Sequence, residues 1–172
     1  MTTERKAAVA GMFYPGEADE LTAWIESELR PFQGEKRKVR GMVLPHAGYI
    51  YSGACALRAL QKIIIPGKVV VAGLNHRYHH ERLVLDGNTT WVTPLGNVAL
   101  DLAGIERLLA DEAVFIRESR LGAREHSLEV MLPLLQYFRR DFTLLPVLVG
   151  CGDLDILLAA AARLAELIKD EP

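Results

Sequence analysis

Three short segments carry histidines beside small or polar residues, the setting in which proteins bind metals or move protons. They read Pro45-His46-Ala47-Gly48-Tyr49, Gly73-Leu74-Asn75-His76 and Arg124-Glu125-His126-Ser127. Two of these histidines, His46 and His76, follow predicted strands, and in an open α/β sheet the carboxyl ends of the strands form the ligand crevice. Neutral imidazoles suit iron, zinc and copper, so the pattern favours a metal site at these two residues. Tyr49 and Asn75 lie beside them and are the predicted substrate contacts.

The third histidine, His126, lies at the start of a predicted helix over residues 127–138. The positive end of a helix dipole disfavours imidazolium, so we expect a neutral ring. Glu125 precedes it and can orient it, and the pair is predicted to act as a general acid or base toward a small molecule.

Each of these residues also has an ordinary structural interpretation. A single histidine after a strand is more often a hydrogen-bonding loop residue than a ligand, and His79 and His80 fit an exposed loop. Cys55 falls within a predicted helix and fits a small buried side chain. Cys151 follows a predicted strand, so a ligand or a reactive thiol there is an alternative.

Several other catalytic motifs are excluded by their own residues. The run from Gly48 to Gly53 has the glycine spacing of a phosphate-binding loop, but Ala54 and Cys55 replace the required Lys and Ser/Thr. No Gly-x-Gly-x-x-Gly follows a strand. Ser127 lacks the glycines of a nucleophile elbow. The remaining hydrolase hypothesis is a metal-independent one that uses cysteine or histidine.

The elements that must position these residues alternate between helix and strand. We predict strands at residues 39–44, 68–74, 83–85, 91–92, 97–100 and 142–149, and helices at residues 18–30, 52–64, 101–110, 127–138 and from 153 onward. Ser52, Asp101 and Asp153 are the predicted N-caps of three of these helices. The run at residues 68–74 is continuously apolar, as in a strand covered on both faces. The pattern predicts one α/β domain over residues 1–172, with a parallel or mixed sheet and helices on both faces.

Composition narrows the possible classes further. The chain has 172 residues, 50% of them hydrophobic, with 20 Lys and Arg against 22 Asp and Glu. This near-balance argues against nucleic-acid binding, which usually needs a strong basic excess. No apolar run is long enough to cross a membrane, and the N-terminus lacks the apolar segment of a signal peptide. With two cysteines and no disulfide pattern, we expect a reduced, cytoplasmic protein.

Several segments resemble the Memo family, whose fold is shared with extradiol-type non-haem iron dioxygenases. They are Ala10 to Pro15, Leu44 to Gly53, Gly73 to His76, Thr93 to Gly96, Glu125 to Val130 with Leu132-Pro133, and Pro146 to Gly150. They occur in the family's order over nearly the whole chain. The resemblance implies that His46 and His76 are metal ligands and that His126 lines the same pocket. The chain ends before the family's Ser-Ser-Asp-Phe-x-His segment and its later cysteine ligand, and is therefore expected to be C-terminally truncated relative to the family.

The function hypothesis is a Memo-like protein with a complete or partial site for Fe(II) or another divalent transition metal. The associated chemistry would be of redox or dioxygenase type on a small molecule. The alternative is a non-catalytic binding or scaffold module that retains the family pocket. A sheet without its later strands exposes an edge, so we also expect a homo-oligomer or a partner subunit that covers it.

Overall fold

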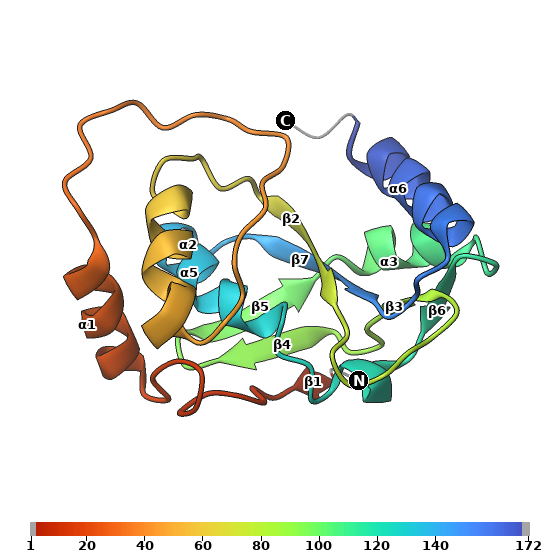
Figure 1. The fold of residues 1–172 in the computed structure, drawn as a ribbon, viewed down its shortest axis with the longest axis horizontal. Helices are drawn as coiled ribbons and strands as arrows, with labels where there is room; N and C mark the ends of the chain where they lie inside the picture. The colour runs from red at the N-terminus through yellow and green to blue at the C-terminus, as the bar shows by residue number, and fades with distance from the viewer. Residues whose placement is uncertain (1–2, 170–172) are drawn as a thin grey trace.

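The computed structural model describes residues 3–169 as one mixed α/β unit (Figure 1). Its strands are β1 (Glu4–Arg5), β2 (Lys68–Leu74), β3 (Leu83–Leu85), β4 (Thr90–Thr93), β5 (Gly96–Leu100), β6 (Phe115–Arg117) and β7 (Thr143–Val149). Its helices are α1 (Ala18–Glu28), α2 (Ala54–Leu60), α3 (Leu102–Leu109), α4 (Ser119–Gly122), α5 (Leu132–Phe138) and α6 (Leu154–Ile168), with a π-helix at Tyr49–Gly53 and a 3-10 turn at Glu129–Met131.

The sheet is built around β7, whose burial is continuous from Leu144 to Leu148. On one side β7 pairs in parallel with β2 over their full length, from Lys68 opposite Thr143 to Leu74 opposite Val149. On the other side the start of β7 pairs in parallel with β5, and its end pairs antiparallel with β3. The sheet extends from these strands through β4 to β1 and through β3 to β6. The mixed α/β architecture predicted from the sequence is confirmed.

The helices form two groups that Figure 1 shows at opposite sides of the sheet. Helix α2 packs against α1 and α5, and α3 packs against α6, β6 and β7. Large apolar side chains fill the space between these layers and are less than 2% exposed, among them Trp91, Phe115, Leu57, Leu132 and Leu144. The core therefore fixes the strands whose carboxyl ends carry the candidate site.

The strands and helix caps with the strongest local sequence signals were predicted correctly. Strand β2 has the predicted bounds, and β7 differs from its prediction by one residue. The carboxylate of Asp101 accepts a hydrogen bond from the Gly104 amide, and that of Asp153 accepts two, from Asp155 and Ile156. Capping side chains of this kind satisfy amides that have no partner within the helix.

Three predictions about the elements are wrong. Residues 39–44 form no strand, and Val43 in this segment is fully exposed. Ser52 does not cap a helix, because it lies within the π-helix and its hydroxyl donates to the Ala47 carbonyl. Strand β2 is covered on one edge and only partly on its faces, since none of its residues is fully buried. An apolar run shows that a strand can be buried, but burial of its faces needs other segments packed on them, and in the described part of the chain these cover β2 only in part.

Between Thr3 and Lys169, none of the helices has both the length and the apolar character that a membrane-spanning segment needs.

Candidate metal centre

The Glu125 carboxylate contacts both His76 and His126 in the candidate site. It accepts hydrogen bonds from three backbone amides, those of His76 at 2.6 Å and of His126 and Ser127 at 2.8 Å each. It also lies 3.0 Å from Nδ1 of His76 and 3.3 Å from Nδ1 of His126. The Glu125 side chain is 1% exposed. One buried carboxylate thus joins the loop after β2 to the segment after α4, 49 residues apart in the chain.

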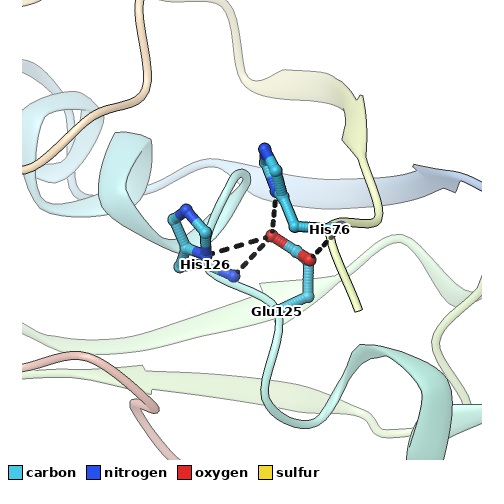
Figure 2. Close-up of side chains that lie close together, drawn as sticks. All are labelled: His76, Glu125 and His126. Carbon is cyan, nitrogen blue, oxygen red and sulfur yellow. Dashed lines mark hydrogen bonds and ion pairs between the residues drawn. The ribbon is translucent and has the colours of Figure 1, made fainter. Parts of the chain in front are cut away.

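Figure 2 shows both imidazoles beside this carboxylate, each with one nitrogen near Glu125. The short contact to Nδ1 of His76 favours the tautomer in which Nδ1 carries the proton and donates it to Glu125. The other nitrogen, Nε2, is then a free lone-pair donor. A carboxylate that holds one histidine nitrogen and frees the other is the usual support of a metal-binding histidine.

The three side chains bring their ligand atoms into one small volume. Those of His76, Glu125 and His126 all lie within 4.8 Å of one another, a spacing that could hold a metal ion. The His76 and His126 rings stack, with centroids 4.7 Å apart and planes at 23°. Sequence reasoning associated Glu125 with His126 but did not foresee its contact with His76.

The His46 ring lies beside the same cluster. Its ring centroid is 5.3 Å from that of His76 and 6.4 Å from that of His126. Two imidazoles that bind one metal through bonds of about 2.1 Å have ring centres about 5 Å apart. The His46–His76 spacing, with planes tilted by 56°, is compatible with such a shared centre.

Burial and hydrogen bonding set the charge of the site. Burial alone would raise the pKa of Glu125, but hydrogen bonds from His76, Ser127 and His126 outweigh it and lower the pKa to about 2. Burial lowers the pKa of His126, against the pull of Glu125, and the nearby His76, His46 and Arg77 lower it further. At neutral pH the carboxylate is therefore charged and the His126 ring is neutral, as a proton acceptor must be.

The neutral state of His126 has a different origin from the one predicted. The helix expected to begin at Ser127 begins at Leu132, after the 3-10 turn at Glu129–Met131. His126 therefore precedes the helix, and burial replaces the helix dipole as the main cause. The Phe13 ring contributes to this burial, with its centroid 4.6 Å from that of His126.

The two predicted substrate contacts occupy different environments. Tyr49 is 3% exposed, and its hydroxyl donates to the Val130 carbonyl, so its polar group already has a partner in the core. Asn75 is partly buried beside His76, where its oxygen accepts from the Arg77 and Tyr78 amides and its NH₂ donates to the Leu121 carbonyl. Asn75 thus shapes the loop that carries His76, and a contact of either residue with substrate stays a prediction.

The two cysteines are both unpaired. Cys55 is exposed, so the burial expected for it is wrong. Cys151 is buried, and its sulfur accepts a hydrogen bond from the Asp153 amide at 3.2 Å.

A buried ion pair that sequence reasoning missed supports the whole region. Arg5 and Glu129 contact each other at 2.8 Å, with both side chains at most 2% exposed. Glu129 also accepts from the Ala8 and Val9 amides and the Tyr14 hydroxyl. Arg5 donates to the carbonyls of Gly122 and Glu125 and lies 4.0 Å from the centroid of the Trp91 ring. These contacts hold the segment that carries Glu125 and His126, and nothing local in the sequence signals a pair 124 residues apart.

Comparisons with a family model and with known proteins all match the same family. The family model described as Memo-like protein matches residues 5–172. MEMO1 family proteins of Methanosarcina mazei and Aquifex aeolicus are 38% and 36% identical over 96% and 97% of this chain, and the matches cover 61% and 62% of those proteins. One from Methanobrevibacter smithii is 36% identical over 85% of this chain and 57% of its own length. The chain therefore spans about three fifths of the length of these relatives.

Proposed function

The chain belongs to the Memo-like family, and we propose that it binds a divalent transition metal, Fe(II) or a similar ion, and acts there on a small molecule. The observation that carries the proposal is the convergence of His76, Glu125 and His126, with the ring of His46 beside them. The donor set fits such a metal, because imidazole nitrogens bind iron, zinc and copper well. A metal held by two histidines and one further group supplies open positions for a substrate oxygen or O₂.

In the proposed arrangement His46 and His76 hold the metal and Glu125 positions His76. We assign Glu125 to positioning because its oxygens already accept three amide hydrogens. The neutral His126 ring then accepts a proton from the bound molecule. A second arrangement uses Glu125 and His126 as ligands, and it is favoured by the short distances between their ligand atoms.

Metal analysis of the purified protein tests the proposal and separates the two arrangements. We expect Fe(II) or Co(II) to bind at one equivalent, and His76→Ala to abolish binding. If His46 is the second ligand, His46→Ala also abolishes binding and His126→Ala retains it, whereas the reverse result supports the second arrangement. His79→Ala is the matched control, since this histidine lies outside the cluster. Failure of the wild-type protein to bind either metal would remove the proposed function.

A non-catalytic binding module is the second candidate. It is favoured by a groove of about 900 Å³ between the segment around His46 and strand β2. Oxygen consumption with catechols and Fe(II) distinguishes the two, because turnover that His126→Ala abolishes excludes a pure binding module. A cytoplasmic location and assembly into an oligomer or with a partner subunit stay predictions.

A further inference from the structure

A second cavity lies beside the candidate metal centre, on the side of the N-terminal segment. It has a volume of about 750 Å³, within the usual range of small-molecule pockets. Residues 4–9 and Met12-Phe13 form one wall, and the residues around α4 with Arg77 form the other. Strand β1, in red in Figure 1, and the loop that follows β2 therefore both contribute to this cavity.

The lining of this cavity is strongly basic. Lys6, Arg77, Arg120 and Arg124 all line it with exposed side chains, whereas Glu4 is the one carboxylate among the lining residues. This local excess contrasts with the formal net charge of −2 for the chain. The cavity lining is therefore positively charged, although the chain as a whole is not.

These four cations also lack acidic partners in the described part of the chain. Arg58, Arg117, Arg139, Arg163 and Lys169 each pair with a carboxylate elsewhere on the surface. No ion pair among residues 3–169 involves Lys6, Arg77, Arg120 or Arg124, so a ligand can bind them without breaking such a pair. Arg77 is held in place by a hydrogen bond from its Nε to the Arg124 carbonyl at 2.8 Å, which leaves its terminal nitrogens free to donate.

The cavity adjoins the metal centre through three neighbours. Arg77 follows His76 and Arg124 precedes Glu125 in the chain, and the Phe13 ring that lines the cavity also contacts the His126 ring. The cavity thus borders residues next to His76, Glu125 and His126, although none of these three lines it. Guanidinium groups bind carboxylate and phosphate oxygens through paired hydrogen bonds, which fixes orientation as well as position.

We propose that this basic cavity binds the anionic end, a carboxylate or a phosphate, of the small molecule on which the metal centre acts. The link to the metal centre rests on the proposed function above, whereas anion binding by the cavity does not. The substrate class is thus an organic anion, and uncharged molecules of the same shape bind less well because they cannot satisfy the four cations.

Binding to the metal-free protein tests the proposal with three probes of similar shape: benzoate, phenyl phosphate and neutral benzamide. Titration followed by NMR or calorimetry should show that at least one anion binds and that benzamide binds at least about tenfold more weakly. Which anion binds more tightly identifies the carboxylate or the phosphate as the natural group. Raising the salt concentration should weaken anion binding and leave benzamide unaffected, because salt screens the charge attraction.

Substitutions localise the effect. Arg124→Gln and Arg120→Gln should each weaken anion binding by about threefold to fivefold, the effect expected for one exposed charge. Arg77→Lys keeps the charge and should weaken it less than Arg77→Gln. Arg140→Gln is the matched control, an exposed arginine outside the cavity, and should change nothing. Equal affinity for benzamide and the anions, no binding of either anion, or equal losses in Arg140→Gln and Arg124→Gln would each overturn the proposal.

The test of anion binding does not depend on whether the protein binds a metal. Anion binding without metal binding retains the basic cavity and removes the proposed function. Metal binding without anion binding retains the metal centre and removes the inferred substrate class.

Discussion

The two sides of the candidate metal centre are built in opposite ways. On the side of His76 and His126, the buried carboxylates of Glu125 and Glu129 accept hydrogen bonds from the backbone amides around them, and Glu129 pairs with Arg5. On the side of His46, residues 29–48 contain no helix or strand. In the described part of the chain, the Arg37 amide donates to the Lys62 carbonyl and the Arg37 carbonyl accepts from the Ile64 amide, near the middle of the segment. Near its end, the Ala47 carbonyl accepts from the Ser52 hydroxyl.

This difference in local structure implies a different entropy cost of metal binding at His76 and at His46. Glu125 holds the rings of His76 and His126 through contacts that exist without a metal, so His76 can bind a metal at little cost in conformational entropy. His46 lies on a segment without helix or strand, so we expect part of the cost of ordering that segment to fall on metal binding. We therefore expect the ordering of the His46 segment to set part of the metal affinity, whereas His76 is already positioned by Glu125.

The largest expected effect comes from breaking the closed side. Glu129→Ala leaves Arg5 buried without a counter-charge, and loss of one partner of a buried ion pair costs about 3–5 kcal/mol of folding stability. Chemical denaturation measures this loss. Glu28→Ala, which removes the partly exposed pair with Arg58, is the control and should cost at most about 1 kcal/mol. Equal losses in the two variants would contradict the role given to the buried pair.

The second-largest expected effect is a loss of folding stability in acid, through protonation of Glu125. The pKa of Glu125 falls from the usual 4.5 to about 2 on folding, so the native state holds its carboxylate charged where the unfolded chain would protonate it. This stability is fully present above about pH 4.5 and is lost as the pH falls toward 2, with a total of order 2–3 kcal/mol. Urea denaturation between pH 6 and pH 2.5 measures it. A Glu125→Gln variant should lose less stability over that range, and an unchanged slope would refute the assignment.

The sequence predicts those parts of the molecule whose signals are local. Strand β2 and the helices capped by Asp101 and Asp153 follow from short patterns of apolar residues and capping side chains. Strands β1 and β6, of two and three residues, depend on partners far along the chain and have no periodicity of their own. The apolar run at residues 39–44 carries the pattern of a strand, but a strand needs a neighbour, and none pairs with it in residues 3–169.

The candidate site divides in the same way. The sequence singled out His46, His76 and His126 through the small or polar residues beside them, although the strand predicted before His46 does not form. The contact between Glu125 and His76, and the support from Arg5 and Glu129, could not be found, because they depend on which distant segments meet. The basic cavity was equally hidden, since Lys6, Arg77, Arg120 and Arg124 come from separate segments of a chain without net positive charge.

The affinity for a metal ion tests whether Glu125 positions His76. Glu125→Gln keeps the size of the side chain but removes the charge that orients His76, and the loss of such a supporting carboxylate weakens metal binding about 10- to 100-fold. Competition with a coloured chelator for Co(II) measures the affinity. Glu28→Gln should leave it unchanged. A loss as complete as that in His76→Ala would identify Glu125 as a ligand and not as a positioning residue.

The smallest expected effect lies on the open side, where a second copy or a partner subunit is predicted to cover the groove. Val39 and Met42 line this groove and are 46% and 40% exposed, and polypeptide binding along β2 would bury them. Static light scattering at tens of micromolar protein should show an oligomer, and Met42→Asp should weaken it about tenfold, because an apolar contact is lost and a charge is placed in the interface. Leu154→Asp is the control, since Leu154 is equally apolar and 67% exposed on α6 but does not line the groove. A monomer in the wild-type protein, or equal effects of the two substitutions, would show that the groove around His46 is not where copies of this chain meet.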